Sequence, residues 1–170
     1  MGLVAVKKWA DAETTAAGKT RARVEPGTLK TLWFNTGTLC NIECAHCYIE
    51  SSPRNDSLSF LSAAEAASYL DELGTLFPGE REIGFTGGEP FLNEGLPAMA
   101  EDALSRGHGV LILTNGMKPM RNHSARLIEL KERHGRRLRL RVSLDHHSKA
   151  VHEAERGRGS WRQALDGLRW

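Results

Sequence analysis

The sequence predicts an α/β protein whose core is a parallel sheet built from about four strand–loop–helix units. From residue 29 onward, a short β-rich run is followed four times by a loop and a helical pattern. Residues of the kind used in functional sites come just after these runs, at the edge where parallel βα folds build their sites. These residues are Cys40, Glu89, Asn115, Ser143 and Asp145.

Composition and charge are those of one soluble globular domain. The 170 residues include 23 Lys and Arg against 21 Asp and Glu, with 40% hydrophobic and 26% charged residues. This balance argues against a disordered tail and against a protein that coats nucleic acid. The longest aliphatic run, residues 110–113, is too short to cross a bilayer, and residues 1–8 do not have the order of a secretion signal. We expect a cytoplasmic protein with neither a membrane nor a nucleic-acid partner.

The first unit follows a segment without strong hydrophobic periodicity. Residues 1–28 are predicted to form an N-terminal arm, ahead of a core domain at residues 29–170. The first strand is predicted at residues 29–36. The first helix begins with a capping box, Ser62 to Glu65, and ends before Pro78. Its predicted buried face consists of Ala66, Leu70, Leu73 and Phe77.

The second and third units repeat this pattern. A strand at residues 83–86 runs into Gly87-Gly88-Glu89-Pro90, and the helix after it starts near Pro97 and ends at Gly107. The apolar stripe of that helix is Leu96, Met99, Ala100, Ala103 and Leu104. A third strand at residues 110–114 leads to Asn115-Gly116, and a helix follows at residues 124–134. We expect that helix to bury Leu127, Ile128 and Leu130.

The fourth strand, residues 138–144, alternates between apolar and polar residues. A parallel strand that is covered on both faces is apolar throughout, so one face should meet a partly hydrated barrel interior. The polar residues are Arg139, Arg141, Ser143 and Asp145. Residues 121–141 hold eight Lys or Arg and two Glu, which a solvated helix face explains most simply; the alternative is an acidic or phosphate-bearing partner.

A final helix is predicted to begin near Ser160. Its apolar stripe, which includes Trp161 and Leu165, stops at Trp170 without a cap or a helix breaker. A fourth strand at the end of the sheet also leaves an unpaired edge. We therefore expect the chain to be a fragment of a longer protein.

The chain has three cysteines, Cys40, Cys44 and Cys47, in a C-x3-C-x2-C loop. An odd number within eight residues is a poor disulfide framework but is typical of a metal site. Three thiolates can hold three irons of a [4Fe–4S] cluster, which leaves the fourth iron open to a small molecule. The alternative is a structural zinc with His46 as fourth ligand, although zinc loops usually draw their ligand pairs from separate segments.

This loop resembles the cluster motif of the radical S-adenosylmethionine (SAM) superfamily, and further matches follow in order. Residues 86–90 resemble the family's GGEP motif, and residues 113–116 its third-strand TNG signature. Residues 142–145 resemble its SLD segment, and residues 156–161 the RG-x-GS-aromatic stretch that follows. Members usually carry six βα units. The resemblance therefore implies a partial, TIM-like (β/α) barrel with about four of an expected six units.

The resemblance also implies a division of roles. Cys40, Cys44 and Cys47 would ligate the [4Fe–4S] cluster, and the amine and carboxylate of SAM would bind the open iron. The remaining cofactor-binding residues would be Gly87, Gly88 and Glu89 at the ammonium group, with Pro90 completing the motif, Ser143 and Asp145 at the ribose, Asn115 in the cavity wall and the backbone of His46 at the adenine. No side chain is assigned as a catalytic residue.

The activity that the resemblance implies is that of an oxidoreductase. The reduced cluster would cleave SAM to methionine and a 5′-deoxyadenosyl radical, which abstracts hydrogen from the substrate. Tyr48 gives a C-x-H-C-Y form similar to members that modify peptides or tailor tetrapyrroles. A flavodoxin or ferredoxin would supply the electron.

Two other function classes stay open. One is an iron–sulfur electron carrier or cluster-binding module without catalysis, which has no need of the GGEP motif. The other is a zinc-stabilised interaction domain. Taken singly, Gly87-Gly88 and Asn115-Gly116 are also typical of ordinary turns, and Glu89 of a helix cap.

Overall fold

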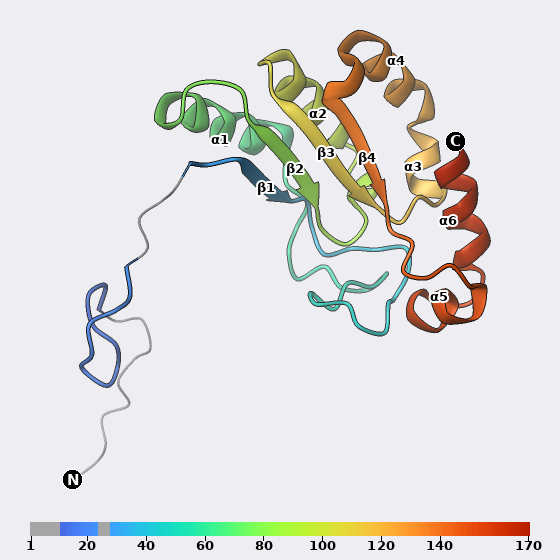
Figure 1. Ribbon diagram of the computed structural model, residues 1–170, viewed down its shortest axis with the longest axis horizontal. Coiled ribbons are helices and arrows are strands. Elements are labelled where there is room, and N and C mark those ends of the chain that lie inside the picture. Colours follow the sequence, from blue (N-terminus) through green and yellow to red (C-terminus); the bar gives the residue numbers. More distant parts are fainter. Residues whose placement is uncertain (1–10, 24–27) are drawn as a thin grey trace.

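The computed structural model describes residues 11–23 and 28–170 (Figure 1). Its centre is a four-stranded sheet in the order β1-β2-β3-β4, with every neighbouring pair parallel. The strands are β1 (Thr31–Asn35), β2 (Glu82–Thr86), β3 (Gly109–Thr114) and β4 (Leu138–Val142). The predicted α/β class and its four strand–loop–helix units are therefore confirmed.

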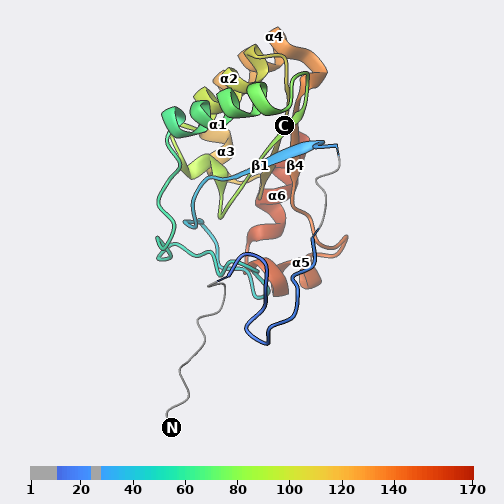
Figure 2. The ribbon, with the colours of Figure 1, turned by 90° about the vertical axis from the view of Figure 1, so that its left-hand side faces the viewer.

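Helices connect the strands and follow the last one. The longer ones are α1 (Ala63–Leu76), α2 (Leu96–Ser105), α4 (Ser124–His134) and α6 (Ser160–Arg169). The shorter ones are η1 (Pro90–Leu92), α3 (Lys118–Asn122), η2 (Gly135–Arg137) and α5 (Lys149–Arg156). Figure 2 shows α1, α2 and α4 along one side of the sheet. Among the described residues, no helix has the length and apolar character needed to span a membrane.

The core lies between the sheet and helices α1, α2 and α4. Register places Phe34 beside Phe85 and Phe85 beside Ile112, all three pointing toward the helices. The rings of Phe34 and Phe85 stack with centroids 5.6 Å apart. The predicted capping box of α1 is present, since Ser62 Oγ accepts from Glu65 N and the Glu65 carboxylate accepts from Ser62 N.

The structure differs from the sequence prediction at several places. Ile128 is 48% exposed, whereas Leu127 and Leu130 are buried. It lies one step of about 100° around α4 from Leu127, and this turns it toward the outer edge of β4. Strand β4 ends at Val142 instead of residue 144. Ser143 N makes a last hydrogen bond to Thr114 O of β3, and the chain then leaves the sheet.

The last helix begins at Ser160, as predicted, but buries small residues. Its buried positions are Ser160, Ala164 and Gly167. A Cβ at residue 167 would lie 1.8 Å from Gly116 O, so this glycine lets α6 pack on the turn after β3. Leu168 and Trp170 remain about half exposed.

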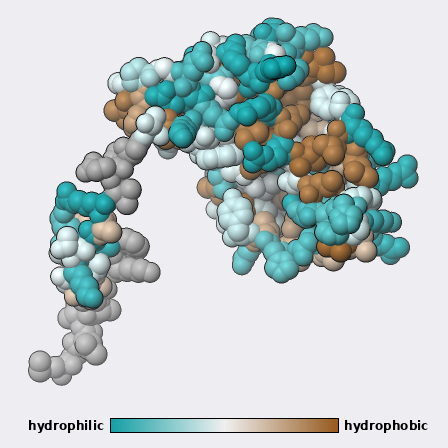
Figure 3. All heavy atoms as spheres, in the orientation of Figure 1, coloured by the Kyte–Doolittle hydropathy of each residue, from teal (hydrophilic) through white to brown (hydrophobic). Residues whose placement is uncertain are grey.

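A cavity of about 710 Å³ lies along the outer edge of β4, between α4 and α6. Figure 3 shows hydrophobic residues gathered where β4, α3 and α6 meet. This cavity shares no lining residue with the cavity at the cysteine loop. Its position follows from β4 being the edge strand of the sheet.

Three of the eight Lys and Arg residues at 121–141 form ion pairs. Arg126 and Arg133 both form ion pairs with Glu101 and Glu129, and Arg139 pairs with Glu82. These pairs support a solvated, ion-paired surface for part of the excess charge, and the alternative of an acidic or phosphate-bearing partner stays a prediction.

The predicted arm at residues 1–28 stays a prediction. Residues 1–10 and 24–27 lie outside the described residues. Within residues 11–23, Thr14 and Thr20 form an antiparallel bridge.

A buried histidine at the start of β3 makes stability depend on pH. His108 is 5% exposed, and its Nδ1 accepts a hydrogen bond from Arg81 N at 3.2 Å. Burial, helped by the charges of Arg106 and Arg81, lowers the pKa of His108. The unfolded chain therefore takes up the proton first, and the stability supplied by neutral His108 is present above the unfolded pKa and lost as pH falls through the folded one.

We expect the variant His108→Asn, whose side-chain oxygen can accept from Arg81 N, to lose less stability on acidification than the wild type. Urea unfolding of both proteins at about pH 8 and about pH 5 measures this difference. An equal loss of unfolding free energy in both proteins on acidification would contradict the assignment of this pH dependence to His108.

Candidate cofactor site

The cysteine loop (residues 36–62) connects β1 to α1 and is held closed by backbone hydrogen bonds. Cys40 N donates to Ser52 O at 3.1 Å, and Thr38 N donates to Leu58 O at 3.3 Å. Cys47 N donates to Cys44 O at 3.3 Å, which forms a tight turn between the second and third cysteines. The three thiols therefore lie on one short, folded segment at the carboxyl edge of the sheet.

The glycine pair after β2 brings a second loop against the cysteine loop. Gly88 N donates to Gly37 O at 2.9 Å, and Glu89 N donates to Leu39 O at 3.0 Å. A Cβ at residue 88 would lie 2.1 Å from Leu39 O, so only glycine permits this approach. Gly87 has a φ of 149°, and a Cβ there would lie 2.6 Å from Gly37 O. The pair thus fixes the start of the cysteine loop.

Glu89 joins the loop after β2 to the loop after β3. It is 1% exposed, and its carboxylate accepts from Thr114 Oγ1 and Asn115 N, both at 2.8 Å, and from Phe91 N at 3.2 Å. Burial raises the pKa of Glu89, and these hydrogen bonds partly oppose the shift. The expected contact with an ammonium group stays a prediction, since both oxygens are bonded to the chain itself. Pro90 follows as the first residue of η1.

Asn115 links the third-strand loop to the cysteine loop. Its Nδ2 donates to Asn41 Oδ1 at 2.8 Å, and its Oδ1 accepts from Met117 N at 3.0 Å. The side chain is 5% exposed. Its neighbour Gly116 has a φ of 72°, which an Asn-Gly turn readily adopts.

A cavity of about 260 Å³ brings most of the predicted residues together. They come from the cysteine loop and from the ends of β2, β3 and β4. The predicted residues in its wall are Cys40, Cys44, His46, Cys47, Gly87, Gly88, Asn115 and Ser143. Glu89 and Pro90 lie behind this wall, and Asp145 lies beside it, bonded to Arg156.

The thiols of the loop differ in their surroundings. Burial is the main cause that raises the pKa of Cys40 to about 11, and burial also raises the pKa of Cys44. The charge of Arg156 opposes the shift at Cys44. Cys47 Sγ accepts from Ser51 N at 3.3 Å. Buried thiols of this kind become thiolates when a metal replaces their protons.

The donor set contains three thiols that lie along one cavity wall. Among the described residues, no three His, Cys, Asp or Glu side chains are grouped to hold one ion. A zinc site needs four ligands converging within about 2.0–2.3 Å of one point. A cluster takes each thiolate at a separate iron, so three thiols spread along one cavity wall suit it. His46 is largely exposed and pairs through Nδ1 with Glu155 Oε2 at 2.6 Å.

Arg156 is a site residue whose position sequence reasoning did not foresee. It lines the cavity from the end of α5, and its Nη1 lies 4.0 Å from Cys44 Sγ. Its Nε and Nη2 donate to the two oxygens of Asp145 at 2.5 and 3.0 Å, which lowers the pKa of Asp145. A ribose contact from Asp145 stays a prediction. The only signal in the sequence was the place of Arg156 at the head of the RG-x-GS stretch.

The match to a known protein family identifies the superfamily of this chain. Residues 34–170 match the radical SAM superfamily. The chain is a member of that superfamily. It is 33% identical over 132 residues to the antilisterial bacteriocin subtilosin biosynthesis protein AlbA of Bacillus subtilis, which covers 76% of this chain and 28% of AlbA. It is 32% identical over 153 residues to the pre-heme d1 synthase of Dinoroseobacter shibae, covering 88% of this chain and 35% of the synthase.

Solved structures share the fold. Streptococcus suis SuiB bound to S-adenosylmethionine superposes with a TM-score of 0.64 at 16% identity, covering 80% of this chain and 30% of SuiB. The predicted partial barrel is thereby confirmed. The radical SAM chain described here spans about a third of the length of the relatives it matches.

Proposed function

We propose that this radical SAM protein holds a [4Fe–4S] cluster on Cys40, Cys44 and Cys47 and binds SAM beside it. The observation that carries the proposal is the shared cavity, whose wall contains all three thiols, both motif glycines, Asn115 and Ser143. When bound and reduced, the cluster would supply the electron for reductive cleavage of SAM, the chemistry that would start hydrogen abstraction from the substrate.

The residues of the chain position the reactants. Gly87 and Gly88 present backbone to the cavity without side chains, so a ligand can approach closely. Asn115 is held by Asn41 and keeps the third-strand loop in the wall. Ser143 offers a hydroxyl from the end of β4, and Arg156 supplies positive charge that favours thiolates at Cys44.

The buried carboxylate of Glu89 supports this arrangement from behind. Its hydrogen bonds join the ends of β2 and β3, so the two loops that face the cysteines keep a fixed separation. We assign the ammonium of SAM to the backbone of the glycine pair and to Glu89, Pro90 to the rigid turn that follows, and the ribose to Ser143 and Asp145. An electron carrier has no use for such a ligand cavity next to its cluster.

The substrate that we propose is a peptide or a tetrapyrrole precursor. The relatives are named for bacteriocin biosynthesis and for pre-heme d1 synthesis, which are consistent with both. The electron would come from a flavodoxin or ferredoxin in the cytoplasm.

The test is product formation. The protein is reconstituted anaerobically with iron and sulfide, reduced with dithionite and incubated with SAM. We expect 5′-deoxyadenosine and methionine in equal amounts, and neither product from the variant Cys44→Ala. A protein that carries a full cluster but releases neither product would contradict the proposal.

A further inference from the structure

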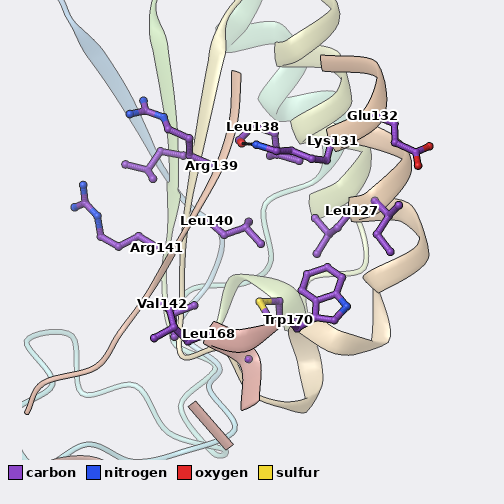
Figure 4. A pocket seen from close by; sticks show the side chains of 14 residues that line it. Leu127, Lys131, Glu132, Leu138, Arg139, Leu140, Arg141, Val142, Leu168 and Trp170 are labelled. Carbon is purple, nitrogen blue, oxygen red and sulfur yellow. Dashed lines mark hydrogen bonds between the residues drawn. The ribbon is translucent and has the colours of Figure 1, made fainter. Parts of the chain in front are cut away.

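Two layers of residues line the face of the sheet opposite the helices, and of these only Thr86 and Leu113 also line the cofactor cavity. Register places Trp33, Gly84, Leu111 and Arg139 side by side in one layer. The next layer, about 6.6 Å nearer the cofactor cavity, contains Asn35, Thr86, Leu113 and Arg141. In Figure 4, Arg139 and Arg141 extend to one side of β4, and Leu138 and Leu140 extend to the other, toward α4.

The indole of Trp33 forms a flat floor in the lower layer, the one farther from the cofactor cavity. A Cβ at residue 84 would lie 2.3 to 2.5 Å from three atoms of that ring, so Gly84 lets the indole lie flat on the sheet. The side chain is nevertheless exposed, at 44% for the residue. A flat aromatic surface that is covered on one face and open on the other suits stacking with another flat ring.

Arg141 supplies a cation in the upper layer, next to the cofactor cavity. Its register partner is Leu113, which lines that cavity, and Ser143 in the same wall comes two residues later, directly after the strand ends. Arg139 is occupied by its ion pair with Glu82, whereas Arg141 is exposed and has no ion-pair partner within the described part of the chain. A free guanidinium at this place is suited to a carboxylate.

We propose, resting on the function proposed above, that the substrate is a flat conjugated ring system bearing carboxylates, stacked on Trp33 and bound through one carboxylate by Arg141. Trp33 lies one layer below the strand residues of the cavity wall, and Arg141 lies in register with Leu113 of that wall. A ring on the Trp33 floor would therefore face the cavity while its carboxylate reaches Arg141. A peptide with acidic side chains could use Arg141 but has no need of the flat floor.

The test is binding to the cluster-free protein, measured by the absorbance shift of a porphyrin that carries four carboxylates. We expect Arg141→Gln to raise its dissociation constant about fivefold, the size of one exposed ion pair. The tetramethyl ester of the same porphyrin should bind wild type and Arg141→Gln equally. Trp33→Leu should weaken both porphyrins, and Trp33→Phe, which keeps a flat ring, should weaken them less.

The control is Arg136→Gln, which removes an equal charge from η2 and should leave the dissociation constants of both porphyrins unchanged. Equal weakening by Arg136→Gln and Arg141→Gln would overturn the proposal, as would a Trp33→Leu variant that binds normally. Tight binding of an acidic peptide in place of the porphyrin would overturn the ring assignment. Because porphyrin binding is measured without the cluster, a failure to bind is distinguishable from a failure to cleave SAM.

Discussion

Replacing Cys40, Cys44 or Cys47 by alanine, one at a time, should abolish the iron–sulfur cluster. The three thiols are the cysteines of one loop, and the chain contains no fourth cysteine to replace a lost one. A [4Fe–4S] cluster that loses one of its three protein thiolates has a second iron without a protein ligand. The cluster is then bound much more weakly, because the iron–thiolate bonds supply much of its binding free energy. Iron and sulfide per chain, measured after anaerobic reconstitution, should fall from about four of each to near zero.

The matched control is Ser57→Ala, an exposed position in the same loop whose hydroxyl bonds only Asn55. This variant should keep full iron and sulfide. Full retention of both in any of the three cysteine variants would contradict the ligand assignment.

Gly88→Ala should strongly destabilise the fold. The added Cβ would lie 2.1 Å from Leu39 O, 2.6 Å from Leu39 C and 2.7 Å from Thr38 O. All three atoms are backbone, so the clash is relieved only if the two loops move apart and break the hydrogen bonds at Gly37 and Leu39. We expect a loss of about 3 kcal/mol or more in the free energy of unfolding, measured in urea, with reduced cluster loading.

The chain offers a matched control in Gly74, within α1. A Cβ there would meet nothing within 4 Å. Gly74→Ala should therefore stabilise the protein by about 0.5–1 kcal/mol, because alanine favours the helix. A Gly88→Ala variant as stable as Gly74→Ala would show that the glycine pair is not needed for close packing.

Much of the fold could be predicted because local signals agree with the tertiary structure. The capping box at Ser62 and Glu65 marks the start of α1 correctly, and the runs that become β2 and β3 are short and apolar. Helices α3 and α5 were missed because they have only five and eight residues, and α5 is mostly polar. The exposure of Ile128 depends on where the sheet ends, which periodicity along one helix does not contain.

The site was predictable where its chemistry is carried by a few residues close in sequence. The cysteines and the glycine pair are of this kind, and the structure places them in one cavity. The position of Arg156 was not predictable, because it lies 112 residues from Cys44 and approaches that thiol only through the packing of α5. The bonding of Asp145 to Arg156 and of Glu89 to the third-strand loop likewise depends on tertiary contacts.

If the cysteine loop holds a four-iron cluster with one iron open to SAM, the cluster should respond to SAM. The low-temperature EPR spectrum of the reconstituted, reduced protein, taken before and after SAM is added, measures this response. We expect the signal of a reduced [4Fe–4S] cluster whose shape changes with SAM. A four-iron signal that stays the same when SAM is added would contradict it.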